Sequence, residues 1–298
     1  MFKKWLKELV DVLERPLSYF FSFHLRPKKS EKFNLVSDKM KIIPKVAIVI
    51  QGPLVRKEDF TLETVRMYKK IFRDYPVIVS VWDDESGEYV EQIKREGAQV
   101  VLNKKPEYAG ISHINYQIFA TFNAIKKAKD LGVDYVLKTR TDLRIYNPNS
   151  IEFLVNFINY FPVDSKYRQK KRIAAASLNT FKYRPYSISD LVLFGQIDDM
   201  IDYWGVNHDM RKVFPAFEKV GDWSMARLCE VYLSTSYLEK IGCKIEWTLA
   251  DSWRKFADNF CIFDQQSLDI YWYKYRRFKE YRKLRYGDMY NDQEMTFG

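Results

Sequence analysis

The alternation of short apolar runs with helical patterns constrains the fold of this chain more than any other sequence feature. The runs that have the length of buried strands span residues 46–50, 77–82, 99–102 and 135–137. Helical patterns fill the intervals, at residues 60–74, 88–96 and 112–132. Strands and helices that alternate across short loops are typical of a parallel or mostly parallel sheet. We therefore predict an α/β fold with a mostly parallel, Rossmann-type central sheet flanked by helices.

The second half of the chain continues the alternation less regularly. We predict strands at 172–178 and 191–194, helices at 198–204 and 225–241, and a loop or lid at 207–222. The chain has 298 residues, of which 47% are apolar, and this is ample for one large folded domain. Its three cysteines lack metal-ligand spacing, which indicates reduced thiols in a cytosolic protein.

Polar residues follow three of the predicted strands at the point where each strand ends. Residues 51–53 follow the first strand, residues 83–84 follow the second, and Asp142 follows the strand at 135–137. Ligands of open α/β sheets bind outside the carboxyl ends of the strands, so we expect these residues to converge. A single acidic loop is usually a solvated turn, but three polar loops at one sheet edge indicate a binding site.

The strand at 135–137 runs directly into a cluster of charged residues. Lys138, Arg140, Asp142 and Arg144 follow within seven positions. Charge at the end of a buried strand is costly unless it is paired or binds a ligand. One carboxylate among three cations suits a metal ion and a phosphate-bearing ligand, although ion pairs on the surface of an ordinary crossover are an alternative.

The net charge of +10 belongs mainly to the two ends of the chain. Residues 1–32 carry 8 Lys/Arg against 4 Asp/Glu, and residues 270–286 carry 7 against 1. A nucleic-acid-binding protein more often carries its charge on the folded body, so we expect no nucleic-acid partner. Basic ends rich in aromatic residues suit an anionic membrane surface.

These features divide the chain into a basic, amphipathic N-terminal extension (1–42), a folded domain (43–269) and a basic, aromatic C-terminal tail (270–298). We expect both extensions to be helical. On a helix, residues 2–15 separate into one apolar and one charged side, and such a helix can lie in a membrane interface. Packing on the domain or on a partner protein is the alternative, and no apolar run reaches the roughly 20 residues that span a bilayer.

Six short motifs resemble the WavE family of lipopolysaccharide-synthesis proteins. They are Ile50-Gln-Gly-Pro53, Ser80-Val-Trp82, Asn115-Tyr-Gln117, Leu137-Lys-Thr-Arg-Thr-Asp-Leu143, Ser189-Asp-Leu-Val-Leu-Phe-Gly195 and Asn259-Phe260. They lie within residues 46–265, and the order of elements is similar to that of GT-A glycosyltransferases. The resemblance implies a hexosyltransferase-like enzyme of bacterial capsule or lipopolysaccharide synthesis. Such an enzyme moves a sugar from a nucleotide-sugar donor to a saccharide or lipid-linked acceptor, in the cytoplasm, at the inner face of the membrane.

The resemblance also implies roles for individual residues. Those expected to bind the nucleotide are Gln51, Gly52, Pro53, Asp83, Asp84, Asn115, Gln117, Lys138 and Arg140. Asp142 is the expected ligand of a divalent metal, Mn or Mg. The usual GT-A metal motif is Asp-x-Asp, and Arg140 stands in place of its first Asp. Arg140 or Lys138 can therefore supply some of the charge that the metal normally brings.

An inverting transferase also needs a general base that accepts the proton of the acceptor hydroxyl. Glu230 lies on the predicted helix 225–241, at a position that resembles the one where GT-A enzymes carry their base. Asp190 is the alternative. A retaining enzyme would need neither.

Two further functions stay open. A sugar-nucleotide transferase would share much of the sheet and release pyrophosphate. A non-catalytic, membrane-associated assembly protein would tolerate the loss of Asp142.

Overall fold

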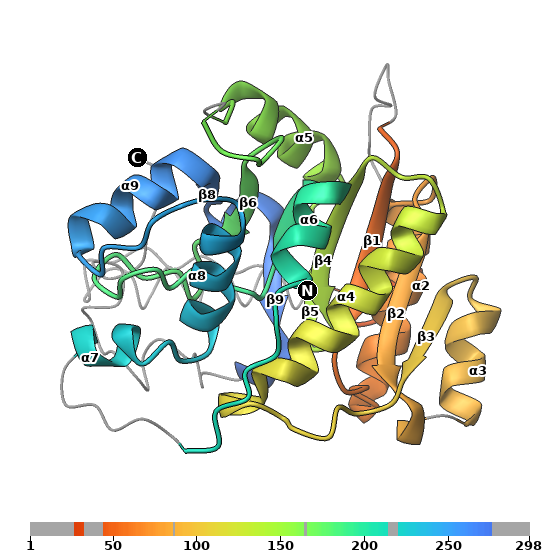
Figure 1. Cartoon of the computed structure of the whole chain (residues 1–298). Coiled ribbons are helices and arrows are strands. Elements are labelled where there is room, and N and C mark those ends of the chain that lie inside the picture. Colours follow the sequence, from red (N-terminus) through yellow and green to blue (C-terminus); the bar gives the residue numbers. More distant parts are fainter. Residues whose placement is uncertain (1–26, 33–43, 86, 164–165, 214–219, 276–298) are drawn as a thin grey trace, which may run out of the picture.

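The computed structural model describes residues 27–32, 44–85, 87–163, 166–213 and 220–275 (Figure 1). Its first half contains the predicted alternation. The elements are β1 (Val46–Gln51), α2 (Phe60–Ile71), β2 (Val77–Trp82), α3 (Glu88–Arg95), β3 (Gln99–Asn103), α4 (Ile114–Asp130) and β4 (Tyr135–Arg140). Each lies within a few residues of its prediction.

The second half holds more regular structure than the sequence indicated. Its elements are β5 (Leu143–Ile145), α5 (Ser150–Tyr160), β6 (Ile173–Ala176), β7 (Leu193–Gln196), α6 (Ile197–Trp204), α7 (Val220–Met225), α8 (Glu230–Lys240), α9 (Leu249–Asn259), β8 (Phe260–Phe263) and β9 (Ile270–Trp272). The helix predicted from residue 225 begins at Glu230, and α7 occupies part of the predicted lid. We did not predict α5, α9, β5, β8 or β9.

The central sheet has seven strands in the order β3-β2-β1-β4-β7-β6-β8. Strands β1 to β4 are parallel, β7 is antiparallel to both β4 and β6, and β6 is parallel to β8. This confirms the predicted α/β class, with a mostly parallel Rossmann-type central sheet flanked by helices. Because β7 runs backwards, its first residues lie at the same edge as the last residues of β1, β4 and β6.

Two hydrophobic layers cover the faces of this sheet. Along β1, Ile48 and Ile50 pack with α2 and α5 on one face, and Ala47 and Val49 pack with α4, α6 and α8 on the other. Every residue of β1 is buried, which explains why this strand is a continuous apolar run instead of an alternating one. Two-sided burial fixes the sheet and holds its carboxyl edge as a rigid frame for the loops that follow.

The second, smaller sheet pairs β5 with β9 in antiparallel orientation. The prediction of a helical C-terminal tail is therefore wrong for residues 270–275, which pack on the folded body as β9 and a 3₁₀ turn (Tyr273–Tyr275) because β9 pairs with β5. The predicted helix at 2–15 and the tail from residue 276 lie outside the described residues. Within the described ranges, no helix combines the length and apolar character needed to cross a bilayer.

Candidate active site

The turn after β1 lies against the end of β4. Gln51 is 5% exposed, and Gly52 follows it with a φ of 134°. A Cβ atom on Gly52 would lie 2.8 Å from Thr141 Oγ1, so the turn requires glycine in both conformation and space. Thr141 Oγ1 donates to the carbonyl oxygen of Pro53 at 2.6 Å. The segment predicted to bind the nucleotide therefore adjoins the charged end of β4.

Arg140 and Asp142 form a two-point ion pair at this edge. Arg140 Nε donates to Asp142 Oδ1 at 2.8 Å, and Nη2 donates to Oδ2 at 3.1 Å. The indole Nε1 of Trp272 on β9 donates to Asp142 Oδ2 at 3.0 Å. Burial alone would raise the pKa of Asp142, but Arg140 and Trp272 outweigh burial and hold this pKa below its usual value. Asp142 is therefore ionised, and both of its oxygens already accept hydrogen bonds.

Arg140 is an accessible cation of the site, with 25% of its side chain exposed. Burial alone would lower the pKa of Arg140, but the bonded Asp142 and the nearby charges of Asp190 and Glu230 raise it. Three carboxylates therefore stabilise one guanidinium group. A planar guanidinium can donate two parallel hydrogen bonds to a phosphate group, which makes Arg140 suited to a phosphate-bearing ligand.

Lys138, two residues before Arg140 on β4, is fully buried. Its Nζ donates to the backbone carbonyl of Asp190 and lies 4.9 Å from the ring centroid of Trp204. Burial lowers the pKa of Lys138 to about 8, against the opposing charge of Asp190. Because its ammonium group holds the segment before β7, we assign Lys138 a positioning role in place of the predicted contact with the nucleotide.

Glu230, the first residue of α8, is partly exposed at the same edge. Asn179, which follows β6, donates through Nδ2 to Glu230 Oε1 at 2.7 Å. Burial and the charge of Asp190 raise the pKa of Glu230 to about 7. Asp190 is only 3% exposed. Glu230 therefore has both the accessibility and the near-neutral pKa that suit a general base.

The backbone around Glu230 adopts conformations that residues other than glycine rarely adopt. Cys229 has a φ of 47°, and across from it Ser112 and His113 have φ values of 55° and 61°. Burial raises the pKa of the Cys229 thiol to about 11, and Glu230 adds to this shift, whereas a hydrogen bond with Ser112 opposes it. This contact places the start of α4 beside the start of α8. Strained backbone of this kind clusters at functional sites.

The end of β2 carries the predicted acidic pair on the solvent side. Asp83 and Asp84 are exposed in a 3₁₀ turn, and Asp84 forms an ion pair with Lys105. Beside them the ring centroids of Trp82 and Tyr116 lie 5.2 Å apart, and His113 stacks on Tyr116 at 5.8 Å. The two carboxylates therefore border an aromatic surface.

Asn115 and Gln117, in the first turn of α4, differ in their surroundings. Asn115 is fully buried, its Nδ2 donates to the carbonyl oxygens of Tyr108 and Asp209, and its Oδ1 accepts from Asp209 N–H. The Asn115 amide therefore anchors the loop after α6, which argues against the predicted contact with the nucleotide. Gln117 Oε1 is buried and has no hydrogen-bond partner among the described residues, so it is the better candidate.

The donor set does not fit the predicted Mn or Mg ion. Asp142 already accepts three hydrogen bonds, and Arg140 places a positive charge against both of its oxygens. In the part of the chain that the structure describes, no three His, Cys, Asp or Glu side chains are grouped as metal ligands. Arg140, which is partly exposed, is a candidate for the cation that would face a phosphate group.

The sequence did not single out several contributors to the site. Asn179 follows a predicted strand, so the rule that identified Asp142 would have found it. Trp204 marked only the end of the predicted helix 198–204, and Tyr116 stood in the Asn115-Tyr-Gln117 motif without a role of its own. Trp272 carried no signal, because its position depends on the pairing of β9 with β5 across more than a hundred residues.

The comparisons with known proteins identify the family of the chain. The chain belongs to the WavE lipopolysaccharide synthesis family, whose model matches residues 46–235, more than half of the chain. No curated protein matches the sequence.

Solved structures of low similarity include three nucleotide- or sugar-handling proteins. A CMP:2-keto-3-deoxy-manno-octonic acid synthetase complexed with CTP is 12% identical, with 74% of this chain and 89% of that chain covered and a TM-score of 0.38. A cytidylyltransferase from Leptospira borgpetersenii is 13% identical, with 74% and 99% covered and a TM-score of 0.35. A glycosyltransferase involved in glycosylation of the major capsid of PBCV-1 is 15% identical, with 59% and 73% covered and a TM-score of 0.32. Because identities and TM-scores are this low, family membership rests on the family model.

Proposed function

We propose that this protein is a glycosyltransferase that moves a sugar from a nucleotide-sugar donor to a saccharide or lipid-linked acceptor in capsule or lipopolysaccharide synthesis. The observation that carries the proposal is the convergence of Arg140 and Glu230 at one edge of the sheet. One of them is a permanent cation, and the other is a carboxyl group with a pKa of about 7. Membership of a lipopolysaccharide synthesis family supports the polysaccharide context.

The nucleotide end of the donor is proposed to lie over β1 and β2. Gln51 and the backbone at Gly52 would contact the base or ribose, and Asp83 or Asp84 would accept hydrogen bonds from ribose or base hydrogens. The neighbouring Tyr116 ring offers a surface on which the base can stack. The backbone N–H groups at the start of α4 would face the diphosphate, because helix N-termini favour anions.

Sugar transfer then breaks the bond between the anomeric carbon and the phosphate oxygen. The electron pair of that bond leaves with the nucleoside diphosphate, and Arg140 stabilises the charge that develops. The acceptor hydroxyl oxygen forms the new bond to the anomeric carbon and gives its proton to Glu230. Asn179 holds the carboxylate of Glu230, and Lys138 holds the segment that carries Asp190.

A thermal-shift panel of nucleotide sugars tests this function. We expect one class among UDP-, GDP-, CMP- and dTDP-linked sugars to raise the melting temperature, because a ligand that binds only the folded state stabilises it by mass action. The same donor should release its nucleoside diphosphate when an acceptor is supplied. Release of pyrophosphate from a nucleoside triphosphate and a sugar phosphate would instead identify a sugar-nucleotide transferase. A panel without any shift would argue for a non-catalytic assembly protein.

The protein is further proposed to act at the inner face of the bacterial membrane, as a peripheral protein. The two basic, aromatic ends of the sequence support this location, since each Lys or Arg near an anionic surface contributes about 1 kcal/mol to membrane binding. The full chain should pellet with vesicles containing 30% phosphatidylglycerol, and less so as salt rises. Equal pelleting with pure phosphatidylcholine vesicles would contradict this.

A further inference from the structure

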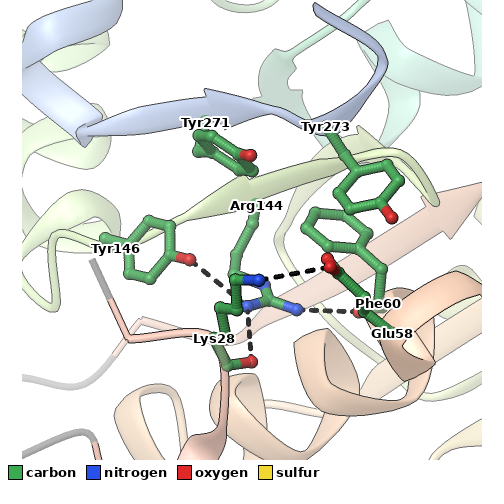
Figure 2. Close-up of a pocket in the computed structure, with 7 residues that line it drawn as sticks. All are labelled: Lys28, Glu58, Phe60, Arg144, Tyr146, Tyr271 and Tyr273. Carbon is green, nitrogen blue, oxygen red and sulfur yellow. Dashed lines mark hydrogen bonds and ion pairs between the residues drawn. The ribbon is translucent and has the colours of Figure 1, made fainter. Parts of the chain in front are cut away.

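A pocket of about 190 Å³ lies beside β5 and β9, outside the site described above (Figure 2). Arg144 on β5 and Tyr271 on β9 line it from paired positions of the small sheet. The rings of Phe60 and Tyr273 form one wall, with centroids 4.5 Å apart. The pocket therefore combines a cation with aromatic walls.

Arg144 is a buried cation that has no carboxylate partner among the residues that the structure describes. It is 1% exposed, and its guanidinium donates to neutral groups: Thr64 Oγ1 and Phe60 O, both at 2.8 Å, Lys28 O at 3.1 Å and the Tyr146 hydroxyl at 3.2 Å. Across the described ranges, no carboxylate lies within ion-pair distance of Arg144. A buried charge is unfavourable unless an opposite charge compensates it, so this pocket favours an anionic ligand.

Lys28 adds a second cation on the solvent side of the pocket. Its side chain is 76% exposed and lies 3.2 Å from Glu58, which also lines the pocket. The backbone of this segment is fixed, because Ser30 N–H donates to Glu63 Oε2 at 2.8 Å and Lys70 Nζ donates to Ser30 O at 2.8 Å. With Arg144 and Lys28 against Glu58, the lining residues carry one net positive charge.

The pocket also lies where the two basic ends of the chain meet the folded body. Lys28 belongs to the N-terminal extension, and Tyr271 and Tyr273 belong to the C-terminal tail. These segments, residues 1–32 and 270–286, carry net charges of +4 and +6. Tyrosine rings are amphipathic and are enriched at the level of lipid headgroups.

We propose that this pocket binds the phosphate group of an anionic lipid headgroup and so fixes the orientation of the protein on the membrane. Lys28 donates to the phosphate, the buried charge of Arg144 attracts it, and the aromatic wall packs against the glycerol portion. This inference rests on the proposed membrane association and is independent of sugar transfer. An acidic saccharide would also compensate the positive charge of Arg144 and Lys28. The two basic ends of the chain meet beside this pocket, however, and this favours the lipid.

Full-length Lys28→Gln and Lys274→Gln variants test the proposal. Both remove one positive charge near the same surface, but only Lys28 lines the pocket. We expect Lys274→Gln to weaken binding to vesicles of 30% phosphatidylglycerol by about fivefold, the general effect of one charge. Lys28→Gln should weaken it at least about 20-fold, because Glu58 then also repels the headgroup. Melting temperatures of both variants should match the wild type, since both side chains are exposed.

Calorimetry with soluble sn-glycerol 3-phosphate gives the second readout. We expect saturable, one-to-one binding that survives in Lys274→Gln and is lost in Lys28→Gln. Inorganic phosphate should bind more weakly, because it lacks the glycerol portion. Binding of methyl glucuronide without binding of glycerol phosphate would overturn the proposal in favour of a saccharide pocket. Equal losses of vesicle binding in the two variants would also overturn it, while the general membrane association would stand.

Discussion

Replacing Arg140 with glutamine is expected to lower the turnover of sugar transfer by about 10²–10³-fold at saturating donor, the usual effect of removing one group that stabilises developing charge. Glutamine keeps part of the length and hydrogen bonding of arginine but cannot neutralise the leaving diphosphate. The donor should still bind through its contacts over β1 and β2. Steady-state kinetics with the donor identified by thermal shift would separate the loss of kcat from any change in KM.

Arg66→Gln is the matched control for this variant. Arg66 forms ion pairs with Glu63 and Glu96 at 2.8 Å each, with a side chain 35% exposed, on α2. A loss of stability from breaking a charge pair should appear in both variants, whereas the loss of turnover should appear only in Arg140→Gln. Equal turnover in Arg140→Gln and wild type would remove Arg140 from the site.

The same position tests whether Arg140 takes the place of a metal ion. Wild-type transfer is expected to persist in excess EDTA. Arg140→Asp, which restores an Asp-x-Asp motif with Asp142, should bind Mn more tightly than the wild type, measured by the loss of the free-ion electron paramagnetic resonance signal. Activity that EDTA abolishes and Mn restores in the wild type would show that the Arg140–Asp142 pair opens to admit a metal.

The elements that the sequence predicted best are those whose burial is uniform. β1 and β2 are covered on both faces, so they are almost entirely apolar, with Gln51 at the end of β1 and Ser80 within β2. β4 is apolar from Tyr135 to Leu137 and then continues with Lys138, Thr139 and Arg140. The rule that ligands bind at the carboxyl edge then located Asp142 and Gln51 without any knowledge of packing. The reversed β7 could not be inferred, because an apolar run carries no sign of its direction.

Side-chain roles were harder to predict than positions. Asn115 and Lys138 lie near the site as expected, but their polar atoms bond to the backbone of Asp209 and Asp190. Whether an amide or an ammonium group faces a ligand or the protein depends on neighbours that are distant in sequence. Trp272 on β9 is a similar case. It belongs to the predicted tail, yet its indole N–H donates to Asp142 in the site.

The second large effect is expected at Glu230, where replacement by glutamine should lower turnover by about 10²–10⁴-fold, the usual contribution of a general base. Glutamine preserves the shape of the side chain and can still contact Asn179, so donor affinity should be nearly normal. Asp190→Asn should lose less, because Asp190 is buried and its charge acts mainly by raising the pKa of Glu230.

The pH dependence separates a base from a merely structural carboxylate. Glu230 must be ionised to accept a proton, so wild-type kcat/KM should rise with pH up to about 7 and then level off. Asp190→Asn removes a charge that raises the pKa of Glu230, so this limb should move to lower pH. The residual activity of Glu230→Gln should lack the limb altogether.

The pH dependence of stability offers a further check on Glu230, since its raised pKa means that the folded state holds the proton of this carboxyl group more tightly than the unfolded state does. The stability contributed by this group is therefore present at low pH and is lost as the pH rises through about 7. Glu230→Gln, which has no charge at any pH, should gain stability relative to the wild type over the same range. A Glu230→Gln variant with normal turnover would exclude it as the base, and an Asp190→Asn variant that loses most of its turnover and whose residual activity lacks the limb would transfer that role to Asp190.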